Sequence, residues 1–246
     1  WTRRMQNRLF ALLSTPRPSV ALAISATAVR GVAIGRGKAA VQVIGHSAVS
    51  LPPGAVRPTA TAVNIADHTT VSAAVKEVMR NLPMRSRRIG LVVPDCVGKV
   101  SFLRFDQIPG NAKELRRLVA WQASKALPYP IEDAQLEYVP GQRLSDGGRE
   151  FIVGVIRRDI VEEYEGVCRG AGVYAGLVDL SGFNVVNVAL SKSTDEKQDW
   201  ILVHIMDCYS TVALIRGNNV VLLRTLNATT GDDVVAVIHQ SAMFYE

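Results

Sequence analysis

The residue types that most often bind metal ions or act as nucleophiles are histidine and cysteine, and this sequence has four of the first and three of the second. The histidines lie far apart, and none has a second histidine or cysteine at the spacing of a metal site. The cysteines also share no ligand spacing, so the sequence predicts reduced, buried thiols in a cytosolic protein and no metal site. These residues are His46, His68, His204, His239, Cys96, Cys168 and Cys208.

Acid–base chemistry has equally few candidates. Glu132-Asp133 falls in an expected turn, and Glu162-Glu163 lies on the solvated face of an expected helix. Asp95 is followed by a cysteine but has no neighbouring base. Gly35-x-Gly37 follows a strand pattern without a helix after it, so it indicates a hairpin turn rather than a dinucleotide site. The sequence therefore predicts no catalytic residue.

Positive charge is concentrated at the start of the chain. The net charge is +6, yet no Asp or Glu precedes Asp67, whereas eight Arg and Lys residues do. Residues 1–13 place Trp1, Met5 and Leu9 on one face of a basic amphipathic helix, which favours contact with an anionic membrane surface. No nucleic-acid-binding motif accompanies these residues, so we expect no nucleic-acid partner.

The size and composition of the chain indicate a folded protein. Its 246 residues are 48% hydrophobic, which is enough for a core. No apolar run reaches the roughly 20 residues of a membrane span, and the first segment lacks the layout of a cleavable signal. Because the chain starts at Trp1 and ends at Glu246 within a helical pattern, we expect a fragment of a longer polypeptide.

Hydrophobic periodicity predicts two units of one kind. The first has the order β-β-β-α-β, as a ribonuclease H-like unit does, at residues 20–26, 29–35, 39–49, 71–82 and 89–93. After a polar stretch at 191–199, three strands and a helix are expected again, at 200–207, 211–215, 220–226 and from Asp232. VAIGRG at 32–37 and VALIRG at 212–217 hold the same place in both series, so we interpret the chain as a duplication.

A segment of different pattern separates these units. It is expected to form strand, helix, two strands and helix, at 97–105, 111–127, 136–139, 151–156 and 159–172. A strand at 173–179 and a helix at 181–190 then complete the first unit. The predicted parts are an N-terminal extension (1–18), a first unit (19–95 and 173–198), an insertion (96–172) and a partial second unit (199–246).

Four blocks of sequence carry a family resemblance. They are LPPGAV at 51–56, VVPD at 92–95, ALPYPIED at 126–133 and VGVIRRDIVEEYEGVCRGAG at 153–172. Together with Asp179 and the helix after it, they resemble in order and spacing the type IV pilus assembly protein PilM. The resemblance implies an actin-like α/β fold, related to the cell-division protein FtsA and made of duplicated ribonuclease H-like units. The insertion would then be a 1C-type α+β subdomain between parts of subdomain 1A, and subdomain 2A would be C-terminally incomplete.

The resemblance also implies partners. Members of the family work at the inner face of the cytoplasmic membrane, where they capture the N-terminal cytosolic tail of the membrane protein PilN between subdomains 1A and 1C. PilN in turn pairs with PilO. We therefore expect a scaffold with a PilN-like partner, and Leu127, Tyr129 and Ile131 are our candidates for the groove. The cytoplasmic part of the type II secretion protein GspL is an alternative resemblance.

Actin-like ATPases hold phosphates and Mg²⁺ between two turns that carry Asp and Gly. By the resemblance, the first pair corresponds to Ala23 and Ser25, and the second pair to His204 and Met206. Asp normally orders the hydrated metal, and Gly lets backbone N–H groups approach phosphate. Both turns have therefore lost these residues, which predicts a degenerate site.

Few residues could replace them. Asp207 comes three positions late in the second turn, and Gly231 is the remnant of a Gly-Gly element near the adenosine. Thr27 and Arg30 could hold an anion weakly. We expect a pseudo-ATPase without bound ATP or magnesium. Two alternatives stay open, namely an active ATPase that ATP would stabilise and an FtsA-like filament former that attaches to lipid through residues 1–13.

Overall fold

The computed structural model describes residues 18–36, 41–145, 147–192, 199–217 and 219–227, together with 235, 236, 238, 239 and 243. The expected amphipathic helix at 1–13 lies outside the described residues, as do Gly231 and Asp232 at the expected start of the final helix. Every strand and helix predicted between residues 20 and 226 is present, within a few residues at each end. In the part of the chain that is described, no helix is long and apolar enough to cross a membrane.

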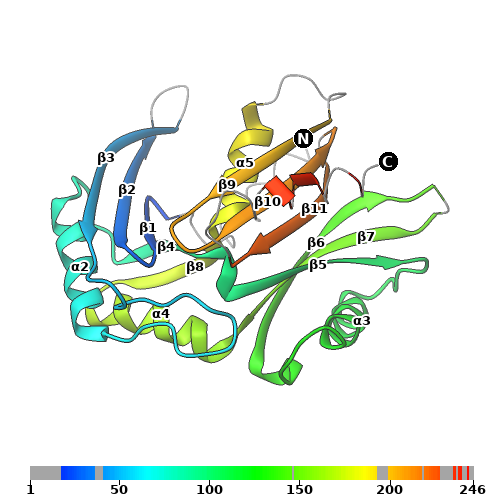
Figure 1. Cartoon of the computed structure of the whole chain (residues 1–246), viewed down its shortest axis with the longest axis horizontal. Helices are drawn as coiled ribbons and strands as arrows, with labels where there is room; N and C mark the ends of the chain where they lie inside the picture. The colour runs from blue at the N-terminus through cyan, green and yellow to red at the C-terminus, as the bar shows by residue number, and fades with distance from the viewer. Residues whose placement is uncertain are drawn as a thin grey trace, which may run out of the picture.

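The first unit is built on a five-stranded sheet with the order β3-β2-β1-β4-β8 (Figure 1). Strands β1, β2 and β3 are antiparallel neighbours, whereas β4 runs parallel to β1 and β8 runs parallel to β4. This is the ribonuclease H-like arrangement that the periodicity predicts. The strands are β1 (Val20–Ile24), β2 (Ala28–Arg36), β3 (Val41–Ser50), β4 (Arg88–Val93) and β8 (Tyr174–Leu180).

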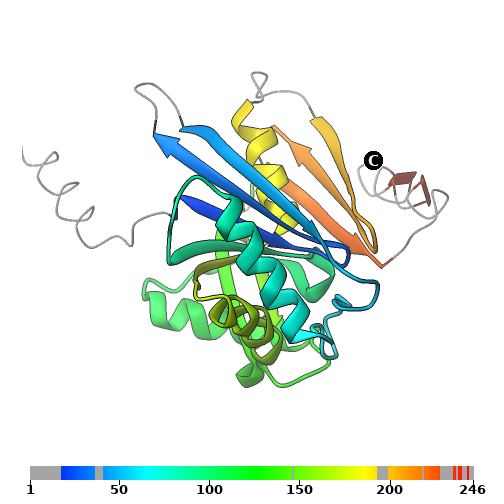
Figure 2. The same ribbon diagram turned by 90° about the vertical axis from the view of Figure 1, so that its left-hand side faces the viewer.

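Two helices, α2 (His68–Asn81) and α4 (Arg158–Gly170), lie side by side against this sheet (Figure 2). Helix α2 begins where the Asp67 carboxylate accepts a hydrogen bond from the Thr70 N–H at 2.9 Å, and its buried valines face β2. The approach is close, because a Cβ atom on Gly31 of β2 would lie 2.4 Å from Val78 Cγ1. Glycine at this position therefore lets the helix pack onto the sheet.

Helix α4 groups with the first unit. Its place in the sequence, directly after the insertion strands, predicts that it belongs to the insertion at 96–172. Its buried side chains Ile160, Tyr164, Val167 and Cys168 instead belong to the core formed by β1, β4 and α2. By packing, the insertion is therefore smaller than its predicted range.

The insertion forms a three-stranded antiparallel sheet covered by one helix. The sheet order is β5-β7-β6, so the strand in the middle is the last in sequence. Its elements are β5 (Gly98–Phe105), α3 (Ala112–Ser124), β6 (Ala134–Arg143) and β7 (Arg149–Arg157). Phe151, Val153 and Val155 of β7 and Val119 of α3 form a separate core between them.

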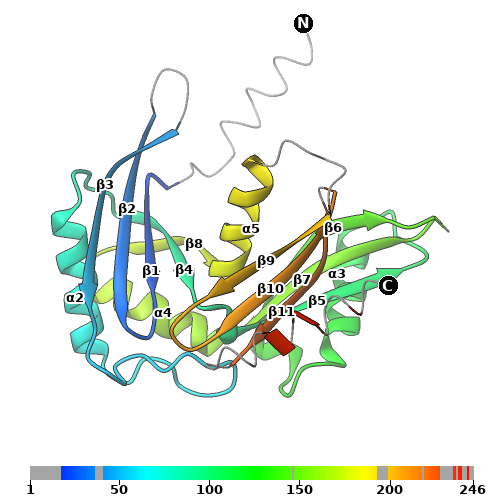
Figure 3. The same cartoon turned by 45° about the horizontal axis from the view of Figure 1, so that its top comes forward.

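The second unit repeats the beginning of the first. Strands β9 (Asp199–Ile205), β10 (Ser210–Arg216) and β11 (Asn219–Leu226) form an antiparallel sheet in the order β11-β10-β9, as β1, β2 and β3 do. Helix α5 (Ser181–Lys192) lies between the two sheets (Figure 3), and its Val186 is buried against Ala213 and Ile215 of β10. The same strand order in both units is what the predicted duplication requires.

Candidate functional site

Two hairpin turns, one from each unit, meet where the units join. The β1–β2 turn contains Ser25 and Thr27, and the β9–β10 turn contains Met206 and Asp207. The Thr27 hydroxyl donates a hydrogen bond to the Asp207 carboxylate, although the two residues are 180 positions apart in sequence. The predicted phosphate turns are therefore neighbours in space, and side chains of this chain bridge them directly.

The first turn is closed by its own side chain. The buried Ser25 hydroxyl donates to the Ala28 carbonyl oxygen at 3.1 Å and accepts from the Ala28 N–H at 3.1 Å. It also accepts from Arg30 Nη1 at 3.2 Å. Ala23, at the expected Asp position, is paired with Arg30 in the β1–β2 ladder. Thr27 and Arg30, the candidates for weak anion binding, are thus already hydrogen-bonded within the protein.

Next to the second turn, His204 near the end of β9 contacts the start of α5. Its Nε2 atom lies 3.1 Å from the Ser181 hydroxyl oxygen, and its ring packs edge-on against Tyr209 with the centroids 6.2 Å apart. Met206 donates its N–H to the Tyr209 carbonyl oxygen at 2.9 Å, which closes the turn. Met206 is the residue that the family resemblance aligns with a glycine, which would allow close approach of a phosphate.

The carboxylate of Asp95 is a feature that sequence reasoning missed. It is only 3% exposed and accepts hydrogen bonds from the Gly182 N–H and the Thr211 hydroxyl, both at 2.6 Å. Burial raises the pKa of Asp95, and the two hydrogen bonds oppose that rise. The local sequence signal was an acid two positions after an apolar strand, and both donors come from residues more than 80 positions away.

The thiols have no features of nucleophiles. Cys96 and Cys168 are buried, as predicted, whereas Cys208 is half-buried. Burial raises the pKa of Cys96 and of Cys168 to about 12, so both remain protonated at neutral pH. Among the residues that the structure describes, no three His, Cys, Asp or Glu side chains gather as a metal site.

The adjacent carboxylates of α4 have different environments. Glu163 accepts hydrogen bonds from the backbone N–H groups of Asn64 at 2.7 Å and Ile65 at 2.8 Å, and so ties the loop before α2 to α4. Glu162 is exposed on the same helix. Glu132 and Asp133 lie in a short 3₁₀ turn, as expected. Glu163 therefore has a structural role that the sequence did not reveal.

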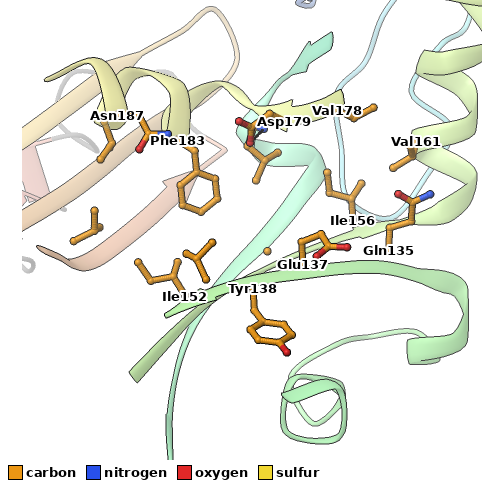
Figure 4. A pocket seen from close by; sticks show the side chains of 15 residues that line it. Gln135, Glu137, Tyr138, Ile152, Ile156, Val161, Val178, Asp179, Phe183 and Asn187 are labelled. Carbon is orange, nitrogen blue, oxygen red and sulfur yellow. Dashed lines mark hydrogen bonds between the residues drawn. The ribbon is translucent and has the colours of Figure 1, made fainter. Parts of the chain in front are cut away.

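An apolar pocket of about 360 Å³ lies where the insertion meets β8 and α5 (Figure 4). Ile152 and Ile156 of β7 face Phe183 of α5 across it. Polar groups that line the pocket include Glu137 of β6 and Asp179 near the end of β8. Burial raises the pKa of Asp179. The other lining residues are Gln135, Tyr138, Val139, Gly154, Val161, Val178, Leu180, Val186, Asn187 and Val220.

The sequence of β7 carries a signal of this pocket. Its run FIVGVI at 151–156 is apolar at every position, so both of its faces need an apolar partner. Phe151 and Val153 face α3 and the insertion core, whereas Ile152 and Ile156 face the pocket. Tyr138 of the neighbouring strand directs its ring away from the pocket (Figure 4), where it packs edge-on against Phe151.

The predicted groove residues lie elsewhere. Leu127, Tyr129 and Ile131 pack against the insertion core beside α3, and none of them lines the apolar pocket. Tyr129 lines a second, more polar pocket of about 400 Å³ whose Arg157 already forms an ion pair with Asp159. The predicted turn and the apolar pocket therefore lie on opposite faces of the insertion sheet.

Solved structures share this fold. The PilM-PilN type IV pilus biogenesis complex contains a chain with a TM-score of 0.77 and 22% identity, and the match covers 92% of this chain and 66% of that one. The cytoplasmic domain of EpsL, an inner membrane component of the type II secretion system of Vibrio cholerae, matches with a TM-score of 0.53 and 9% identity over 85% of this chain and 70% of that one. A Bacteroides thetaiotaomicron protein with an actin-like ATPase fold has a TM-score of 0.52 and 9% identity over 92% of this chain and 76% of that one.

These similarities establish an actin-like α/β fold, as predicted. No curated protein sequence matches the chain. A family model described as type IV pilus assembly protein PilM matches residues 21–240, which include nearly all the described elements. The chain therefore belongs to the PilM family of type IV pilus assembly proteins.

Proposed function

We propose that this chain is a cytosolic scaffold of type IV pilus assembly that binds the N-terminal tail of a PilN-like membrane protein in the apolar pocket. The observation that carries the proposal is the pocket itself, which is lined mainly by aliphatic side chains of the insertion, β8 and α5. A structural neighbour of this chain is the PilM-PilN complex. The pocket also lies between the parts that correspond to subdomains 1C and 1A, where the family resemblance places the tail.

The pocket suits an extended, mostly apolar peptide. Val139 is 56% exposed on β6, although it lines an apolar surface. Exposed apolar residues that adjoin an apolar pocket mark interaction sites more often than single apolar residues scattered over the surface do. Strand β6 is also at the edge of its sheet, so its main chain can pair with an added strand while the pocket receives side chains.

Tail binding has consequences for location. Through the tail, the scaffold is held at the cytoplasmic face of the inner membrane, and it contacts a PilO-like protein only through its PilN-like partner. This arrangement does not need a membrane-spanning segment in the described part of the chain.

We also propose that the junction between the units works without nucleotide, as a pseudo-ATPase. Ser25 closes the first turn, and the second turn carries Met206 and His204 instead of Gly and Asp. The hydrogen bond from Thr27 to Asp207 spans the space between the turns. These contacts support a fixed junction in which side chains replace a bound phosphate and its metal ion.

The test of tail binding is fluorescence anisotropy with a labelled synthetic peptide of the N-terminal cytosolic residues of the PilN-like protein from the same organism. Val139→Glu puts a charge at the rim of the pocket and should weaken binding at least tenfold. The matched control is Val63→Glu, because Val63 is 68% exposed and lies outside the pocket, and its affinity should equal that of the wild type.

A third variant separates the two candidate surfaces. Tyr129→Ala removes the ring from the turn after α3 and should leave the affinity unchanged. If Tyr129→Ala weakens binding and Val139→Glu does not, the tail binds at the predicted turn and the pocket assignment is wrong. If the wild type does not bind the peptide, the scaffold proposal fails.

A further inference from the structure

Helix α5 connects the junction between the units to the apolar pocket. Its first two residues contact the junction, where the Ser181 hydroxyl meets His204 and the Gly182 N–H donates to Asp95. The next turn of the helix supplies Phe183 and Val186 to the lining of the pocket. A shift of the helix start therefore changes the shape of the pocket, because fewer than five residues separate the two.

The Asp95 carboxylate has a separate hydrogen-bond donor for each of its two oxygens. One oxygen accepts from the Gly182 N–H at the N-terminus of α5, and Thr211 of β10 donates its hydroxyl to the other oxygen. The carboxylate thus joins the end of β4, the start of α5 and the second unit. The fit is tight, since a Cβ atom on Gly182 would lie 2.5 Å from Asp95 Oδ2. Only glycine at this position leaves room for the carboxylate.

The chemistry of these contacts explains why the Asp95 carboxylate fixes the start of α5. Unpaired N–H groups and the helix dipole make a helix N-terminus attractive to an anion. Because Asp95 is buried, removal of its carboxylate leaves the Gly182 N–H without its acceptor and leaves the Thr211 hydroxyl with Thr225 Oγ1, 3.1 Å away, as its remaining partner. The start of α5 must then move or admit water.

We propose that Asp95 is a positioning residue for tail binding. By holding the start of α5 against both units, it keeps Phe183 and Val186 where the tail needs them. The residue itself does not line the pocket, so its effect passes through α5. The inference rests on the proposed function, because the tail is the ligand whose affinity is affected.

The experiment measures two quantities on each variant, the affinity for the labelled tail peptide and the hydrogen–deuterium exchange of residues 181–187 without peptide. Asp95→Ala and Gly182→Ala should each lower the affinity at least tenfold and accelerate exchange in this segment. Asp95→Asn should restore most of the affinity, because its amide oxygen still accepts from Gly182 and its NH₂ group can donate to Thr211.

The control is Asp67→Ala, which removes the cap of α2, a helix that packs against β2, β3 and α4. This variant should lower the melting temperature while it leaves the affinity and the exchange of residues 181–187 unchanged. If Asp95→Ala alters neither quantity, or if Asp67→Ala alters both equally, Asp95 contributes only to general stability and the inference is wrong. If the wild type itself does not bind the peptide, the proposed function fails instead, which is a different result.

Discussion

The hydrogen bonds of Glu163 give a prediction that can be worked out quantitatively. The Glu163 carboxylate accepts from the backbone of Asn64 and Ile65, which are 0% and 2% exposed. The side chain of Asn64 in turn holds its own loop, since it accepts from the Thr59 N–H at 2.9 Å and donates to the Ala62 carbonyl oxygen at 2.8 Å. Glu163→Ala therefore removes two of the hydrogen bonds that tie this folded loop to α4, whereas the Tyr164 hydroxyl still reaches Asn64 Oδ1 at 3.4 Å.

The magnitude follows from these contacts. A hydrogen bond to a charged group contributes about 1.5–3 kcal/mol, and the partly exposed carboxylate of Glu163 favours the lower value. Two such bonds give a loss of about 3 kcal/mol in the free energy of unfolding. For a chain of this size, each kcal/mol shifts the melting temperature by about 2–4 °C, so the expected decrease is about 6–12 °C.

Urea unfolding followed by circular dichroism measures this loss. The matched control is Glu162→Ala, which changes the same residue type one position earlier on the exposed side of α4 and should stay within about 0.5 kcal/mol of the wild type. Glu163→Gln keeps a neutral acceptor and should lose about half as much as the alanine variant. If the two alanine variants unfold within 0.5 kcal/mol of each other, the assigned role of Glu163 is incorrect.

Three further outcomes are expected. Millimolar Mg-ATP should leave the melting temperature unchanged and give no binding heat, because the two turns are already bridged; a micromolar affinity in calorimetry would contradict the pseudo-ATPase proposal. Iodoacetamide at pH 8 should alkylate Cys208 first, as peptide mass spectrometry can show, because burial raises the pKa of all three thiols but Cys208 is only half-buried, whereas Cys96 and Cys168 are buried and have pKa values of about 12. Hydrogen bonds from Thr70 lower the pKa of Asp67 below 3.8. Its stabilisation is therefore present above pH 3.8 and is lost as the pH falls through the lower folded-state pKa, so Asp67→Asn should flatten the acid side of the stability profile.

Much of the molecule followed from local sequence patterns. The alternation in β1 and the helical spacing of Val71, Val75 and Val78 predicted those elements, because periodic burial is encoded within about ten residues. The identity of single residues also carried information. The family resemblance aligns Ser25 and Met206 with glycines that would let a phosphate approach, so a degenerate site can be predicted without the structure.

The apolar pocket was not among the predictions made from the sequence. The groove candidate taken from the sequence is the turn with Tyr129, which is apolar and conformationally restricted by prolines. The pocket combines residues from β6, β7, β8 and α5, and apart from the two apolar faces of β7 these segments have the pattern of ordinary core. A concave surface depends on how layers stack, so its residues share no spacing in the sequence.

The sequence by itself determined the elements, their order and the duplication, and through the family resemblance it predicts a loss of the phosphate-binding residues. Only the tertiary structure decided which groups meet across the junction, since Thr27 and Asp207 are 180 positions apart and Asp95 and Thr211 are 116 positions apart. It also decided that α4 packs with the first unit and that the pocket lies behind β7. The physical reason is that periodicity and capping act between near neighbours in the chain, whereas these contacts exist only after separate layers have packed together.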